Sequence, residues 1–168
     1  MITDQDVDFL FELDQDPEVM RYINGGKVPT LEEVHSIFLP RLNSYFNREK
    51  GWGLFKITVQ ETNKEIGWIL VRPMGFFTDQ PEYRNLEIGW RLLQTAWGNG
   101  YATEAATAVI EAITAQGDVD FISALAMEGN EASIKIMKKL GMKFVKKYLH
   151  HDPLGDEECV YYRVRVES

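Results

Sequence analysis

The sequence predicts a single domain, residues 1–168, of the mixed α+β class, with a central, mostly antiparallel sheet of six to seven strands flanked by helices. Three observations lead to this prediction. Helix-start signals crowd the first fifty residues, and strand-like runs follow one another from Gly51 onward. An alanine-rich amphipathic segment then separates these runs from further strands. A chain of 168 residues can bury a substantial core in one domain.

The N-terminal part of the chain is predicted to be mostly helical. Thr3 can cap a first helix whose opening turn is acidic, and Pro17 stands at the first position of a second helix. The segment Asn24–Gly26 then breaks the chain. Thr30 begins a capping box, which opens a longer helix that runs to about Arg48.

Three strands are predicted next. In "WGLFKITVQ" apolar and polar residues alternate with the period of a strand, and "EIGWILV" fits the returning strand of a hairpin after the turn "ETNK". The segment "RPMGFFTDQPEYRN" is predicted as a loop, and "LEIGWRLL" as the third strand. The third strand directs its side chains to two faces, with Leu86, Ile88 and Trp90 on one and Glu87, Gly89 and Arg91 on the other.

The second half of the chain begins with a glycine turn, Gly98–Gly100, that leads directly into a helix. "VDFISALAM" is apolar almost throughout, as in a strand buried on both faces. A short helix follows, with Asn130 as its cap and Gly141 as its stop, and "MKFVKKYL" and "CVYYRVRV" close the chain as an antiparallel pair. The strands on either side of the main helix are expected to run parallel, joined by a right-handed crossover. The main helix carries an apolar stripe of mostly small residues, which are Ala102, Ala105, Ala106, Val109 and Ile113.

Composition and charge exclude several classes of protein. The formal net charge of −8 opposes a nucleic-acid partner, which requires a basic surface, and suits a cationic substrate such as an amine. No apolar run approaches the roughly 20 residues of a membrane span, and the acidic N-terminus differs from a signal peptide. Cys159 is the single cysteine, and no spacing of His, Cys and Asp is typical of a metal site. We therefore expect a cytoplasmic protein without a disulfide framework, a bound metal or a membrane contact.

The glycine turn predicts an anion site. Its glycines leave the backbone free of Cβ atoms where the first N–H groups of a helix point outward. A P-loop would need a Lys-Ser/Thr pair after the last glycine, where Tyr101 and Ala102 stand. A dinucleotide fingerprint would need a third glycine, where Thr103 stands. The remaining alternative for the anion is the pyrophosphate of coenzyme A.

The runs "LEIGWRLLQTAWGNGYATEAATAVI" and "NEASIKIMKKLGMKF" together resemble the GNAT superfamily of N-acetyltransferases, and within it most nearly the ribosomal-protein N-terminal (Rim-type) branch. The resemblance covers nearly the whole chain. It implies a GNAT-like acyl-CoA N-acyltransferase fold, whose sheet is splayed open between its two parallel central strands to hold acetyl-CoA as a co-substrate. It also implies the residues that bind acetyl-CoA: Ile88, Gly89, Trp90, Gln94, Trp97, Gly98, Asn99, Gly100, Tyr101, Ala102, Thr103 and Asn130.

The reaction expected of this family is the attack of an amine on a thioester, which needs an unprotonated amine, support for the oxyanion and a proton for the thiolate. Glu87 is the candidate base, directly or through water, and the alternative is a solvated strand glutamate. Gly89 fits a β-bulge whose free N–H faces the acetyl carbonyl.

Two positions depart from the pattern of the family. Thr95 stands where relatives usually have Gln or Arg, although Gln94 is adjacent. Met137 stands where many relatives have the tyrosine that protonates the departing thiolate, and Ser133 is the nearest hydroxyl on the same helix. Ser133 is therefore the candidate substitute for that acid.

The sequence thus predicts an acetyl-CoA-dependent N-acetyltransferase of a primary amine, with a protein N-terminal α-amine as the first candidate acceptor. The alternatives are a small amine (a polyamine or an aminoglycoside) as acceptor, a non-catalytic CoA-binding sensor, and a nucleotide-binding protein. The protein is expected to be a monomer or a homodimer. The acceptor site is expected to be shaped by the first fifty residues and two loops, and the acids in these loops indicate a cationic acceptor: Asp79, Glu82, Asp152, Asp156, Glu157 and Glu158.

Three histidines complete the candidates. The adjacent His150 and His151 could serve as a base or as ligands, but adjacent histidines in a loop after a strand are usually exposed. His35 lies in a helix that could border the substrate site. Cys159 opens a strand and is expected to be a small core residue.

Overall fold

The computed structural model describes residues 1–167. The α-helices are α1 (Val7–Leu13), α2 (Pro17–Asn24), α3 (Leu31–Glu33), α4 (Leu39–Tyr45), α5 (Tyr101–Thr114) and α6 (Glu131–Lys139). The strands are β1 (Gly53–Val59), β2 (Lys64–Met74), β3 (Glu82–Leu92), β4 (Phe121–Ala126), β5 (Lys143–His150) and β6 (Glu157–Arg165). Short 3-10 segments, η1 (Asp4–Asp6) and η3 (Gln94–Ala96), and a π-helical segment, η2 (Val34–Phe38), complete the order.

The strands form one six-stranded sheet in the order β1-β2-β3-β4-β6-β5. Every neighbouring pair is antiparallel except β3 and β4, which run parallel. These two strands pair only over Asn85–Glu87 and Phe121–Ser123, although both continue beyond that point. The sheet is therefore splayed open between its two parallel central strands, and the predicted fold class is confirmed.

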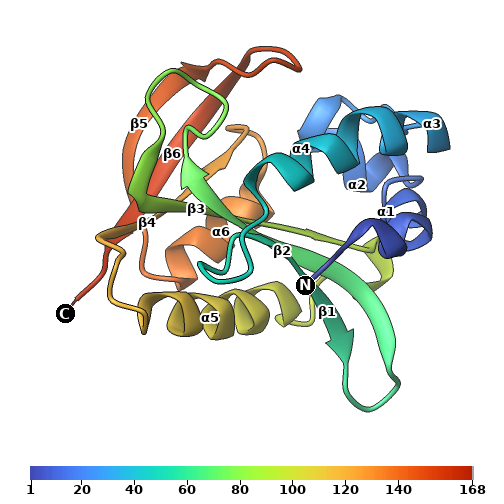
Figure 1. Ribbon diagram of the computed structural model, residues 1–168, viewed down its shortest axis with the longest axis horizontal. Coiled ribbons are helices and arrows are strands. Elements are labelled where there is room, and N and C mark those ends of the chain that lie inside the picture. The colour runs from blue at the N-terminus through green and yellow to red at the C-terminus, as the bar shows by residue number, and fades with distance from the viewer. Residues whose placement is uncertain (168) are drawn as a thin grey trace.

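Helices cover both faces of the sheet (Figure 1). On one face, α5 and α6 pack on β2, β3, β4 and β6, and Ala106, Ile113 and Met137 are fully buried there. On the other face, α1, η2 and α4 pack on β1 and β2, around Leu54 and Trp68. The small residues of the α5 stripe let that helix lie close to the sheet, as predicted.

The N-terminal helices begin where the sequence predicts. Thr3 and Thr30 each form a capping box, and the side chain of Asp16 caps α2. The last of these helices is shorter than predicted: it ends at Tyr45 and not near Arg48. It also contains the π-helical turn, because Pro40 has no N–H to donate and the N–H of Leu39 reaches the carbonyl of Val34, five residues back.

Half of the predicted loop "RPMGFFTDQPEYRN" is strand, so this prediction is wrong at both ends of the segment. Strand β2 continues to Met74 and β3 begins at Glu82. A register shift between Pro73 and Met74 accommodates the proline within the strand pair. Only the segment 75–81 connects the two strands, and the extension of β2 places Arg72 directly opposite Glu87.

A buried hydrogen-bond network joins the strands at the point where β3 and β4 separate. The hydroxyl of Ser123 donates to Oδ1 of Asn85 (2.5 Å) and lies 2.9 Å from the hydroxyl of Tyr161. The side-chain amide of Asn85 donates to the Tyr161 hydroxyl (2.9 Å). The network thus connects β3, β4 and β6 across the last residues at which β3 and β4 are paired, and it fixes where the splay begins.

We expect Ser123→Ala to destabilise the protein, because it leaves Oδ1 of Asn85 without its donor and the buried O–H of Tyr161 without its acceptor. The expected loss is about 1–3 kcal/mol in the free energy of unfolding, measured by urea denaturation. Ser36→Ala, at an exposed position, is the control and should change the same free energy by less than about 0.5 kcal/mol. Equal effects of the two substitutions would contradict a structural role for the network.

Candidate active site

A cleft of about 610 Å³ lies between helices α2 to α4, one face of the sheet, and the loop that joins β5 to β6. Its walls are largely apolar, with Ile37 and Phe38 on the helix side and Leu70 and Leu125 on the sheet side. A volume of this size is typical of a site for a small molecule or a peptide end. The cleft reaches Leu125, Ala126 and Met127, where β4 has separated from β3.

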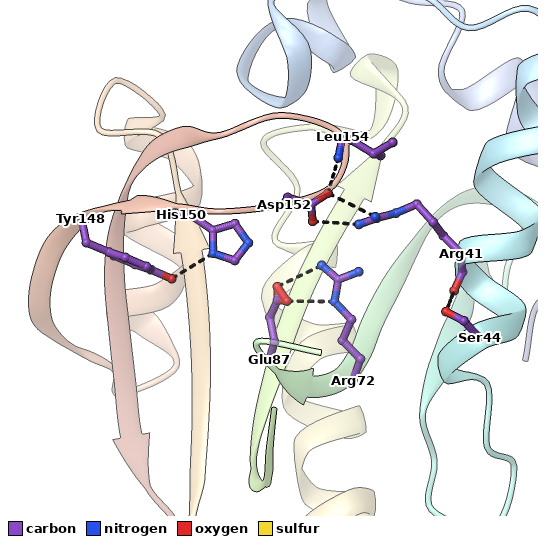
Figure 2. Close-up of polar contacts among 8 residues, drawn as sticks. All are labelled: Arg41, Ser44, Arg72, Glu87, Tyr148, His150, Asp152 and Leu154. Atoms are coloured by element: carbon purple, nitrogen blue, oxygen red, sulfur yellow. Dashed lines mark hydrogen bonds and ion pairs between the residues drawn. The ribbon is translucent and has the colours of Figure 1, made fainter. Parts of the chain in front are cut away.

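Three ion pairs line this cleft. Arg72 holds Glu87 with both ends of its guanidinium, Nε to Oε1 at 2.9 Å and Nη2 to Oε2 at 3.3 Å (Figure 2). Arg41 holds Asp152 in the same bidentate way, at 3.1 and 3.0 Å, and so ties α4 to the β5–β6 loop. The third pair joins Arg91 to Asp14 at 2.9 Å, where burial raises the pKa of the Asp14 carboxyl and the charge of Arg91 opposes that rise.

Glu87 is therefore not the solvated strand glutamate of the alternative interpretation. Glu87 is only 8% exposed, and it lies on the face of β3 that lines the cleft. Burial acts to lower the pKa of the Arg72 guanidinium, but the charges of Glu87 and Tyr45 and the hydrogen bond to Glu87 raise it on balance. The arginine stays charged, so Glu87 faces the cleft as one half of a fixed ion pair.

A second polar group lies on the same face of the sheet, on strand β5. The hydroxyl of Tyr148 lies 3.1 Å from Nδ1 of His150, and Figure 2 shows the opposite edge of the imidazole turned toward Glu87 and Asp152. His150 is the last residue of β5 and is partly buried, whereas the side chain of His151 is 71% exposed and pairs with Asp156. The expectation of an exposed histidine pair thus holds for His151 and is wrong for His150.

Cys159 also lines the cleft, at the start of β6, and is buried as predicted. Burial, together with the charges of Glu157 and Glu87, raises the pKa of its thiol to about 11. A thiol is nucleophilic only as the thiolate, so this cysteine is poorly suited to carry an acyl group.

We expect the folded protein to react slowly with iodoacetamide. At pH 8 a thiol with a pKa of about 11 contains about 100-fold less thiolate than one with the ordinary value of 9.0. Mass spectrometry of the folded and the urea-unfolded chain measures the two rates of alkylation. Similar rates in both states would contradict the raised pKa.

The glycine turn has the geometry that an anion site requires. Gly98 and Gly100 have φ angles of +78° and +77°, and a Cβ atom at either position would meet only open space. Gly100 directly precedes α5, a helix of 14 residues whose first N–H groups face that space. The amide of Asn99 donates to the carbonyls of Ala96 and Trp97, which fixes the turn itself. These features fit a phosphate group at the start of α5.

The other residues predicted to bind acetyl-CoA lie around the splay and the turn. The indole of Trp90 donates to the hydroxyl of Ser133 at 3.2 Å, which links β3 to α6. Gly89 is in regular register with Leu70, so the predicted bulge at this residue is wrong: the β2–β3 irregularity lies at Pro73 and Met74 instead. Ile88 and Ala102 are buried, Trp90, Tyr101 and Thr103 are partly buried, Gln94 and Trp97 are exposed, and Asn130 caps α6.

Met137, which stands where many relatives have a tyrosine, lies in the core. Met137 is 1% exposed and packs among the apolar side chains between α6 and the sheet. Ser133, one turn earlier on the same helix, is partly buried and accepts the hydrogen bond from Trp90. Of the two, only Ser133 places a hydroxyl beside β3.

The acidic side chains of the two loops do not act together in the cleft. Asp152 and Glu157 line it, but the charge of Asp152 is paired with Arg41. Burial, followed by the charge of Asp152, raises the pKa of the Glu157 carboxyl. Asp79 and Glu158 are exposed, and so is His35, which does not line the cleft although its helix does.

Within residues 1–167, no group of His, Cys, Asp and Glu side chains is arranged to hold a metal ion. In the same part of the chain, none of the helices combines the length and the apolar composition that crossing a bilayer requires.

Comparison with known proteins agrees with this geometry. Residues 1–143 match the family described as "Acetyltransferase (GNAT) domain". The uncharacterized N-acetyltransferase YoaA of Bacillus subtilis (strain 168) is 25% identical over 169 residues, which cover 98% of this chain and 90% of that protein. The chain therefore belongs to the GNAT acetyltransferase family.

Two solved structures have the same fold. The aminoglycoside acetyltransferase AAC(6')-Ib, in complex with coenzyme A and kanamycin, superposes with a TM-score of 0.77 at 18% identity, over 98% of this chain and 92% of that chain. A ribosomal-protein-alanine N-acetyltransferase from Brucella melitensis superposes with a TM-score of 0.70 at 17% identity, over 98% and 97% of the two chains. At these identities the likeness shows the fold, and assignment to the ribosomal-protein branch stays a prediction.

Proposed function

We propose that this acetyltransferase moves the acetyl group of acetyl-CoA to a primary amine that binds in the cleft. The observation that carries the proposal is the splay between β3 and β4, which opens beside the glycine turn on one side and the cleft on the other. We propose that the splay joins the anion site to the site for the second substrate. Acetyl-CoA supplies an activated thioester, and the residues of the chain bind and orient the two substrates.

For the donor, we propose that the pyrophosphate lies on the N–H groups from Trp97 to Thr103. Gly98 and Gly100 leave the approach to these groups open. The backbone of β3 from Ile88 to Trp90 is unpaired with β4, so we propose that it holds the part of the donor that leads to the thioester. Asn130 caps α6 and lies close to this path in our proposal, and Ser133 would support the sulfur end.

For the acceptor, we propose that Glu87 holds the amine. Arg72 occupies one site on each carboxylate oxygen, and each oxygen retains another lone pair that can accept an N–H from an ammonium group. The base role predicted for Glu87 is less well supported, because both of its oxygens already accept hydrogen bonds from Arg72. Its negative charge instead favours an acceptor that arrives as a cation.

We propose a protein N-terminal α-amine as the first acceptor to test. The apolar walls of the cleft fit a peptide end with apolar side chains, and three of its acids are already neutralised by arginines. A polyamine or an aminoglycoside, which carries several positive charges, would find fewer unpaired carboxylates. Both kinds of acceptor occur in the names of the structural neighbours, so the small-amine alternative is tested beside the first.

The function is tested by calorimetric titration with acetyl-CoA, ATP and NAD, followed by turnover assays. We expect acetyl-CoA to bind in the micromolar range, on the order of −8 kcal/mol, and ATP and NAD to bind more weakly. Release of the CoA thiol is then measured with N-terminal peptides, polyamines and aminoglycosides. Binding of acetyl-CoA with turnover of no amine would favour the non-catalytic sensor. Preference for ATP or NAD would exclude the acetyltransferase.

A further inference from the structure

We infer that His150, oriented by Tyr148, is the residue that takes the proton from the acceptor amine. The inference rests on the proposed function. It assigns the general base of the reaction to His150 in place of Glu87. It depends on three features of the cleft: the face of the sheet on which His150 lies, the partners of the neighbouring acids, and the hydrogen bond to Tyr148.

The sheet register places His150 on the cleft face. On β5 and β6, Tyr148 is paired with Cys159 and His150 with Glu157. Cys159 and Glu157 line the cleft, and so do His150 and Glu87. A smaller hollow beside the cleft is also lined by Arg72, Glu87, His150 and Asp152, so these four side chains converge on one place.

The two acids that line the smaller hollow together with His150 are held in ion pairs. Both oxygens of Glu87 accept from Arg72. Both oxygens of Asp152 accept from Arg41, and one also accepts the N–H of Leu154 at 2.9 Å. Glu157, which lies opposite His150 in the register of β5 and β6, has no such partner within residues 1–167, but it does not line the smaller hollow.

His150 has the bonding pattern of an oriented base. Its Nδ1 lies 3.1 Å from the Tyr148 hydroxyl, while Nε2 has no hydrogen-bond partner among the described residues. Figure 2 shows Nε2 on the side of Glu87, Arg72 and Asp152. If Nδ1 donates its hydrogen to the Tyr148 oxygen, Nε2 carries the lone pair. Burial raises the pKa of the Tyr148 phenol, which keeps it neutral as the acceptor of that hydrogen bond.

The protons of the reaction balance without a dedicated acid. The acceptor binds as an ammonium beside Glu87 and gives one proton to Nε2 of His150, which releases it to water. The neutral amine then forms a bond to the acetyl carbon as the carbon–sulfur bond breaks. The second proton leaves the nitrogen for the departing sulfur, so the products are an amide and the CoA thiol. This sequence requires no tyrosine at the position of Met137.

Charged side chains lie around His150 on every neighbouring element of the cleft. The acids are Glu87 on β3, Glu157 on β6 and Asp152 in the loop, and the bases are Arg72 on β2 and Arg41 on α4. Tyr148, Tyr161 and Cys159 are further titratable side chains near His150, and the ammonium of Lys146 lies 4.9 Å from the centre of the Tyr148 ring. The dependence of activity on pH in each variant is therefore compared with the dependence measured for the wild type.

The test compares His150→Gln, His150→Ala and Tyr148→Phe with the control His35→Gln, whose side chain is exposed and lines neither the cleft nor the smaller hollow. We expect His150→Gln to lower kcat/KM about 100- to 1,000-fold and to remove the rise of activity with pH, while the affinity for acetyl-CoA is unchanged. Added imidazole should restore part of the activity of His150→Ala. His35→Gln should retain full activity.

A second readout does not depend on turnover. The chain has three histidines, so ¹⁵N NMR of the imidazoles can be assigned with the His151→Gln and His35→Gln variants. At pH 8 we expect the Nε2 of His150 to be unprotonated and Nδ1 to carry the hydrogen. In Tyr148→Phe this tautomer should lose its preference, and kcat should fall with KM unchanged.

The outcomes separate the inference from the function on which it rests. Wild-type turnover with an active His150→Gln, or a hydrogen on Nε2 in the free protein, would overturn the inference and leave the acetyltransferase in place. Failure of the wild type to bind acetyl-CoA overturns both.

Discussion

Gly100→Val is expected to abolish acetyl-CoA binding, with a loss of at least about 100-fold in affinity, equivalent to about 2.7 kcal/mol. Gly100 has a φ of +77° and precedes the first turn of α5. A valine there would place its Cβ and both γ-methyl groups in the space that an approaching phosphate must occupy. It would also strain the turn, because β-branched residues rarely adopt a positive φ. Calorimetric titration with acetyl-CoA measures the effect.

Gly117→Val separates loss of the site from loss of stability. Gly117 follows the other end of α5, has a φ of +85°, and also faces open space. The backbone strain of the two variants should therefore be similar, about 1–2 kcal/mol each. We expect Gly117→Val to lower the melting temperature about as much as Gly100→Val while binding acetyl-CoA normally. Equal loss of binding in both variants would contradict an anion site at Gly100.

Local patterns were sufficient to predict most of the fold. The capping residues Thr3, Asp16 and Thr30 mark helix starts through bonds within a single turn, so they can be recognised from a few adjacent residues. The glycine turn is local in the same sense. Its positive φ angles and the helix that follows depend mainly on adjacent residues. The parallel pair β3–β4 follows from the helix between the two strands.

The ends of β2 and β3 could not be predicted in the same way. A proline, a glycine and two phenylalanines in "RPMGFFTDQPEYRN" are typical of a loop. The strand pair tolerates Pro73 because its register shifts there. The loop-like pattern assigns Arg72 to a loop and therefore does not predict its pairing with Glu87. The signal that could have found it is the alternation of "EIGWILVR", which places Arg72 on the same face as Trp68 and Leu70.

The remaining residues of the site depend on tertiary contacts. Arg41 and Asp152 are 111 positions apart, and their pairing follows from the packing of α4 beside the β5–β6 loop. Tyr148 and His150 share a strand face that becomes part of the cleft only through the register of β5 on β6. No spacing within the sequence encodes such contacts. The sequence therefore predicts Glu87 as a candidate residue but does not predict its partners.

Glu87→Gln is expected to lower kcat/KM about 100-fold, because hydrogen bonds to charged groups contribute about 1.5–3 kcal/mol. The same change removes the charge that compensates Arg72, whose side chain is only 16% exposed. Breaking a buried ion pair on one side costs about 3 kcal/mol or more of the free energy of unfolding. A loss of activity in the single variant could therefore reflect a distorted cleft, and urea denaturation must accompany the kinetic assay.

The double variant Arg72→Met with Glu87→Leu distinguishes the two causes. Replacing both members of a buried ion pair by apolar side chains of similar volume is often neutral or stabilising. We therefore expect the double variant to unfold at nearly the urea concentration of the wild type and yet to stay about 100-fold less active. If activity returned together with stability, Glu87 would serve the fold alone, and the amine would have to be held by another carboxylate of the cleft. If activity stays low in a stable protein, the charge of Glu87 acts on the acceptor itself.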